Sequence, residues 1–204
     1  AKDVNTKVRA SALKALAANY KGEDLNALYE QALNEQSYAI ASEGFDAIAN
    51  LNPELAMKKA LALENEPSKE IIYSIMDLYS KNGTDANHEY FKKAKKQFSG
   101  FELMSFGNLY GKFLKRCTKP ETVIDAAKLL TKMASGDNKY VKYTAQKVMK
   151  DNLINVWQSK EDKLNSQIEK LKKENQDVTT LTSDLKVITD TKKQIVDLYN
   201  TIKK

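Results

Sequence analysis

The residues of this sequence that could do chemistry are few, and one run begins like a catalytic motif: His88-Glu89-Tyr90-Phe91-Lys92. The zinc-peptidase motif HExxH places two imidazoles one helical turn apart, so that both can bind the same metal ion. Here Lys92 stands where the second imidazole must be, and His88 is the only histidine of the chain. The run therefore cannot build that zinc site. We predict instead that His88 is a surface histidine near the start of a helix.

Nucleophilic catalysis has no better support in the sequence. Cys117 is the only cysteine, which excludes an internal disulfide, and no histidine is available to activate it. Its expected role is that of a small buried apolar group. The sequence contains neither a glycine-rich phosphate loop nor a GxSxG nucleophile turn. We therefore expect no catalytic, cofactor-binding or metal-ligating residue in this chain.

The composition is that of a folded protein with a modest excess of positive charge. The 204 residues are 42% hydrophobic and carry 33 Lys and Arg against 27 Asp and Glu, a formal net charge of +6. Only Arg9 and Arg116 are arginines, and lysine makes poor bidentate contacts with phosphate, so nucleic acid is not an expected partner. No apolar run approaches the length of a membrane span, and no secretory signal opens the sequence, so no membrane partner is expected. The compartment, cytoplasmic or periplasmic, stays open.

Aromatic residues are concentrated in one region, where seven lie between Tyr90 and Phe113. A base-stacking surface would need these rings to face solvent among basic groups. Their helical spacing predicts instead that they belong to the core. The four lysines that fall between them are expected to form a solvated outer face: Lys92, Lys93, Lys95 and Lys96.

An internal repeat gives the organisation of the chain. DVNTKVRASALKALA at Asp3–Ala17 is followed at an offset of 32 by EQSYAIASEGFDAIA at Glu35–Ala49. The matched positions are Val8, Ala12, Ala15 and Leu16 in the first copy, and Ile40, Gly44, Ala47 and Ile48 in the second. A third copy opens at Pro67, and a fourth, weaker copy lies at Tyr140–Met149. This spacing predicts an all-α fold over residues 1–157: an α-α superhelix, or solenoid, of stacked helix pairs of the HEAT or armadillo kind, whose first two helices form an antiparallel pair.

The sequence changes character after Trp157, where Gly and Pro disappear and charged residues increase. Two series of positions with alternating steps of four and three follow one another, out of register by one residue. The join, Asp177–Thr180, is rich in β-branched and cap-forming residues. We predict that residues 158–204 form a helical hairpin or coiled-coil-like extension, a separable appendage, with one long bent helix as the alternative.

The first helix begins almost at Ala1 and carries apolar groups on two sides, of which only one can be covered by the second helix, near 25–33. We therefore interpret the chain as a fragment of a larger array, with a processed mature protein as the alternative. The open edge is expected to fray or to self-associate, and the C-terminal hairpin is a second surface for self-association.

The chain resembles the C-terminal helical domain of the aminopeptidase N family of zinc metallopeptidases, in particular its bacterial members. The resemblance covers residues 1–157 and rests on DVNTKVRASALKALA, on SKEIIYSIMDLYSKNG at Ser68–Gly83, on SGFELMSFGNLYGKFLKR at Ser99–Arg116, and on NKYVKYTAQKVMKDNL at Asn138–Leu153. It implies a non-catalytic domain that encloses the active-site cavity of the enzyme and limits the access of peptides. The zinc, HExxH and a GxMEN-type motif would lie on a separate catalytic domain, since this sequence has neither motif.

The resemblance thus implies two partners, the catalytic domain of the same enzyme and its peptide substrate, and it assigns no catalytic residue to this chain. The alternative is a free-standing helical-repeat scaffold, whose concave face or C-terminal hairpin binds a partner protein. The two hypotheses differ in whether the gene encodes HExxH in frame upstream of Ala1.

Overall fold

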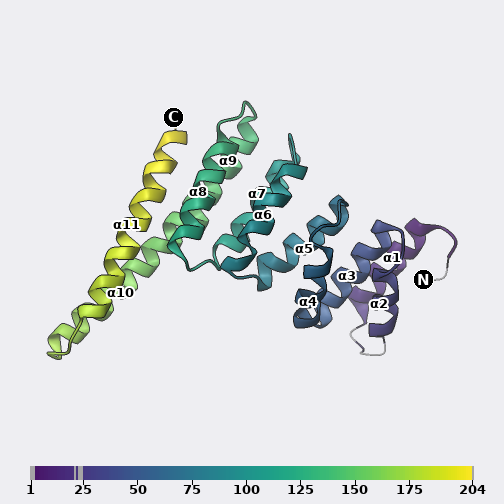
Figure 1. Cartoon of the computed structure of the whole chain (residues 1–204), viewed down its shortest axis with the longest axis horizontal. Coiled ribbons are helices and arrows are strands. Elements are labelled where there is room, and N and C mark those ends of the chain that lie inside the picture. Colours follow the sequence, from purple (N-terminus) through teal and green to yellow (C-terminus); the bar gives the residue numbers. More distant parts are fainter. Residues whose placement is uncertain (1–2, 21, 23–24, 204) are drawn as a thin grey trace. The chain divides into compact units, whose positions relative to one another are not determined.

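The computed structural model describes residues 3–20, 22 and 25–203, and most of them are helical (Figure 1). The described residues contain no β-strand, so the predicted all-α class is confirmed. The helices form two compact units, an N-terminal unit of residues 1–83 and a C-terminal unit of residues 84–204, which are treated separately below. No helix in the described part is both long and apolar enough to span a bilayer. The superhelical arrangement of the repeats stays a prediction.

The N-terminal unit is built around one central helix. Its helices are α1 (Thr6–Asn19), α2 (Asn26–Leu33), α3 (Tyr38–Leu51), α4 (Pro53–Leu63) and α5 (Lys69–Asn82). Helix α3 contacts each of the other four. Its residues Ile40, Gly44, Ala47 and Ile48 are all buried, as the repeat predicts. The sequence also predicts how α4 starts, because the Asn52 side chain caps the helix by accepting the Leu55 N–H at 3.0 Å, and Pro53 occupies the first turn.

The four repeat positions of the first helix do not form its buried face, contrary to the sequence prediction. Leu13 is the one buried residue of α1, whereas Val8 is 49% exposed and Ala15 is exposed as well. The physical reason is that α1 packs mainly against α3 and not, as expected, against α2, so a different side of the helix is buried. Arg9, which donates from Nη2 to Glu35 Oε2 at 2.7 Å, ties α1 to the segment before α3.

Gly44 lets α2 and α3 approach closely. A Cβ atom at this position would lie 2.8 Å from both the Tyr29 carbonyl oxygen and the Leu33 amide nitrogen. Both atoms belong to the backbone of α2, which cannot move aside as a flexible side chain would. The small residue of the repeat is therefore required by the distance between two helices.

We predict that Gly44→Ala destabilises the N-terminal unit by about 1–3 kcal/mol, because the overpacking outweighs the gain of about 1 kcal/mol in helix propensity. Gly136→Ala is the matched control, since the nearest atom to its added Cβ would lie at 3.8 Å. Urea unfolding followed by circular dichroism measures both variants. Equal stability of Gly44→Ala and the parent chain would contradict the close approach of α2 and α3.

The C-terminal unit places its aromatic residues inside. Its helices are α6 (His88–Ala94), α7 (Glu102–Leu114), α8 (Pro120–Ala134), α9 (Lys139–Val148), α10 (Asn155–Lys173) and α11 (Thr179–Ile202). Helix α6 is short and lies between two 3-10 turns, Asp85–Asn87 and Lys95–Gln97, and a π-helical turn at Met149–Ile154 joins α9 to α10. Of the seven aromatic residues expected in the core, six are buried, and the exception is Phe101, which is 67% exposed.

The C-terminal hairpin is confirmed, because α10 and α11 are two helices that pack against each other (Figure 1). Glu161 of α10 accepts hydrogen bonds from Thr189 and Lys192 of α11. The domain boundary expected at residue 157 falls within α10, and α11 also packs along α8. Gln146 of α9 adds a contact by donating to the Ile202 carbonyl at 2.6 Å.

We predict that a chain ending at Ser159 loses thermal stability in its C-terminal unit, because removal of α11 uncovers the surface of α8 on which it packs. Thermal unfolding followed by the fluorescence of Trp157, the only tryptophan, reports on this unit. An unchanged midpoint would instead support the separable appendage that the heptad pattern predicts.

Candidate functional site

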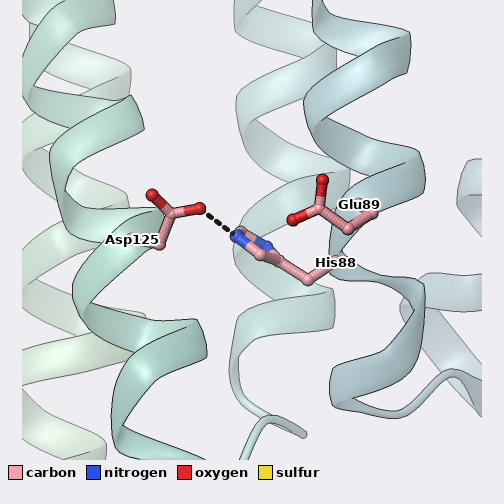
Figure 2. Close-up of side chains that lie close together, drawn as sticks. All are labelled: His88, Glu89 and Asp125. Atoms are coloured by element: carbon pink, nitrogen blue, oxygen red, sulfur yellow. Dashed lines mark hydrogen bonds and ion pairs between the residues drawn. The ribbon is translucent and has the colours of Figure 1, made fainter.

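The only imidazole of the chain lies inside the C-terminal unit, so the predicted surface position of His88 is wrong. His88 is the first residue of α6 and is 5% exposed. Its Nε2 lies 3.0 Å from Oδ2 of Asp125 on α8, an interaction that Figure 2 shows, and its Nδ1 lies 3.1 Å from the hydroxyl of Tyr110 on α7. One side chain thus connects three helices.

The hydrogen bonds indicate where the protons of this network lie. Tyr110 is completely buried, and burial holds the pKa of its phenol well above the ordinary value, so the group keeps its proton. With a neutral ring, the Tyr110 hydroxyl donates to Nδ1, and Nε2–H of His88 donates to the Asp125 carboxylate. Both ring nitrogens therefore have partners without any ligand from outside.

Three groups that could bind a metal ion lie close together here: His88, Glu89 and Asp125, with donor atoms within 4.8 Å of one another (Figure 2). However, the ammonium group of Lys92 lies 2.8 Å from Glu89 Oε1 and 2.9 Å from Asp125 Oδ2. This cation already forms an ion pair with each of the two carboxylates that a metal ion would need. The cluster also has a single imidazole, so it does not fit the zinc site of an HExxH peptidase.

The charges of this cluster stabilise one another at the protein surface. The hydrogen bond from Lys92 lowers the pKa of Asp125, outweighing the opposite effect of burial, and the His88 hydrogen bond lowers it further. The hydrogen bond to Glu89, followed by that to Asp125, raises the pKa of Lys92. Because the pKa of Asp125 is lowered, its ionised carboxylate contributes fully to the stability of the folded chain above the ordinary carboxyl pKa. This contribution is lost as the pH falls through the lowered value.

A second carboxylate holds the start of α8 and so helps to place Asp125. Asp85 accepts the Thr118 N–H at 3.0 Å and the Lys119 N–H at 3.1 Å, just before α8 begins at Pro120. Burial acts to raise the pKa of Asp85, but these hydrogen bonds outweigh it and hold the pKa below the ordinary value. The two amides that Asp85 binds would otherwise lack a helical partner.

Cys117 is buried, as the sequence predicts, and its thiol donates a weak hydrogen bond to the Phe113 carbonyl of the preceding helical turn at 3.8 Å. Burial, followed by the negative charge of Asp85, raises the pKa of this thiol to about 12. A thiol with that pKa is protonated at neutral pH and is a poor nucleophile.

The chain matches no protein-family model, no curated protein and no solved structure. In the described part of the chain, the groups with the most reactive chemistry, His88 and Cys117, both lie in the interior and both contact their own protein.

We predict that Tyr110→Phe destabilises the C-terminal unit by about 1–3 kcal/mol, because Nδ1 of His88 is left buried without a partner. Tyr143→Phe is the matched control, because Tyr143 is 65% exposed and its change should lie within about 0.5 kcal/mol. Urea unfolding followed by Trp157 fluorescence measures both. Equal effects of the two substitutions would show that the Tyr110 hydroxyl does not support the imidazole.

We also predict that Cys117 is protected from thiol reagents in the folded protein. Ellman's reagent at pH 8 should release much less than one equivalent of chromophore from the native chain within minutes, and one equivalent in guanidinium chloride, because the thiol is buried and protonated. Rapid stoichiometric labelling of the native chain would contradict the buried position.

Proposed function

We propose that this chain is the non-catalytic C-terminal helical domain of a bacterial zinc aminopeptidase and that it limits which peptides reach the active site of that enzyme. The observation that carries the proposal is the sequence resemblance over residues 1–157. Its motifs fall on packed helices of this structure: the motif at Ser68–Gly83 forms α5, that at Ser99–Arg116 contains α7, and that at Asn138–Leu153 contains α9.

The proposed role is steric. A rigid helical wall beside a catalytic cavity admits short or unfolded peptides and excludes folded proteins, and it needs packed helices rather than reactive groups. The placement of the two reactive side chains supports this role, because His88 serves to join α6, α7 and α8, and Cys117 lies in the interior. The zinc ion would be held by the catalytic domain and not by this chain.

The purified chain should therefore show no aminopeptidase turnover with a chromogenic aminoacyl substrate and should hold no stoichiometric zinc after dialysis. In addition, the reading frame that precedes Ala1 should encode HExxH. Turnover that survives purification, one tightly bound zinc per chain, or an upstream frame without HExxH would each contradict the proposal.

The alternative, a free-standing scaffold that binds a partner protein, is favoured by one observation. Phe101 and Tyr140 lie on the surface with their rings 5.9 Å apart, and Lys139 is placed over the Tyr140 ring at 5.2 Å. Exposed aromatic pairs are enriched at protein interfaces. This function would be preferred if the upstream frame lacks HExxH.

The outer face of α1 fits either function as a surface for contact with another helix. Val8 of α1 is exposed, and so is Val4, which lies just before the helix begins. In the aminopeptidase proposal a preceding helix would cover them, whereas a free-standing chain would self-associate through this edge or through the C-terminal hairpin.

A further inference from the structure

We propose that an open groove between α6 and α8 binds an acidic protein segment that carries a large apolar side chain. The groove has a volume of about 350 Å³. It is lined by the apolar side chain of Leu129 and by five lysines: Lys92, Lys93, Lys95, Lys96 and Lys132. This inference goes beyond the proposed function and does not depend on it.

The lysines of this groove come from separate parts of the chain. Lys92 and Lys93 lie in α6, Lys95 and Lys96 in the 3-10 turn that follows it, and Lys132 in the last turn of α8. The solvated outer face of one helix accounts for lysines on α6 alone and does not require a cation from a second helix. Their convergence places like charges around one depression, which costs stability unless an anion is bound.

The lining of the groove contains more cations than acidic groups. Glu89 is the one acidic residue in its lining, and it forms an ion pair with Lys92. Lys92 forms a second ion pair with Asp125. The surrounding unit adds to the positive potential. Residues 84–204 contain 24 Lys and Arg against 15 Asp and Glu, a formal net charge of +9, whereas residues 1–83 contain 9 against 12, a net charge of −3. The electrostatic field of the C-terminal unit therefore attracts an anionic partner.

The residue types favour an acidic protein segment over nucleic acid. The groove contains lysines and no arginine, and lysine lacks the planar fork that binds phosphate through two hydrogen bonds. The aromatic rings of α6, Tyr90 and Phe91, are buried and offer no surface on which bases could stack. Leu129 instead provides an apolar contact between the cationic walls. A carboxylate-rich segment with one leucine-sized side chain satisfies both features.

The test uses the whole chain and a fluorescein-labelled peptide of six glutamates around a central leucine, followed by fluorescence anisotropy at low salt. The groove variant is Lys95→Glu/Lys96→Glu/Lys132→Glu. The control variant, Lys163→Glu/Lys170→Glu/Lys173→Glu, changes three exposed lysines of α10 and alters the net charge equally. We expect the groove variant to weaken binding about tenfold or more and the control by less than about threefold, with both effects reduced at high salt.

Three further measurements test the role of charge, the apolar contact and the preference for peptide over nucleic acid. The set Lys95→Gln/Lys96→Gln/Lys132→Gln removes charge without reversing it and replaces the first variant if circular dichroism shows that variant unfolded. A peptide with serine in place of leucine should bind more weakly than the leucine peptide. Oligothymidine of similar charge should compete poorly. Equal losses in the groove and control variants, equal binding of the serine peptide, stronger binding of oligothymidine, or no binding of the acidic peptide at low salt would each overturn the proposal.

Discussion

The C-terminal unit depends on a polar side chain in an otherwise aromatic interior. His88 stacks on Tyr110 with ring centroids 6.0 Å apart, and Phe91, which lies one helical turn further along α6, stacks on Phe113 of α7 at 4.5 Å. Aromatic contacts alone tolerate a range of ring offsets and tilts. The two hydrogen bonds of the imidazole remove that freedom, because a shift of α6 relative to α7 or α8 would leave a buried nitrogen unpaired at a cost of about 1–3 kcal/mol.

This constraint extends from the interior to the surface through Asp125. The carboxylate accepts a hydrogen bond from the buried imidazole and forms an ion pair with Lys92 at the rim of the lysine-lined groove. Asp85 fixes the start of α8 in the same part of the unit. The position of the groove walls is thus set by the same contacts that hold the core. This arrangement uses the imidazole for structure and leaves charged and apolar side chains at the surface.

Local patterns predict much of this fold. The start of α4 is one example, because a capping asparagine, Asn52, and a first-turn proline, Pro53, mark it. The aromatic core and the C-terminal hairpin follow from helical spacing and from the change of register near Asp177. These features depend on residues within a few turns of one another, which is the range over which sequence periodicity is informative.

Features set by long-range contacts were not predictable in the same way. The partners of His88 lie 22 and 37 residues away, and no local pattern identifies them. One signal was available, because His88 lies three residues before Phe91 and therefore on the same helix face as a core aromatic. Likewise, which face of α1 is buried depends on whether the helix packs against α2 or against α3, and no local pattern decides this. The π-helical turn is accompanied by a distant contact, in which Asn152 donates to the Gly111 carbonyl at 2.7 Å.

Nitrogen-15 NMR of the imidazole tests the central claim most directly, and its assignment is unambiguous because the chain has one histidine. The account predicts a distinct, slowly exchanging Nε2–H resonance, protected by burial and by the hydrogen bond to Asp125. Substitution of Tyr110 by phenylalanine should shift the Nδ1 resonance. A single pair of averaged resonances in rapid exchange with water, unaffected by that substitution, would show that His88 is a surface side chain and would contradict the account.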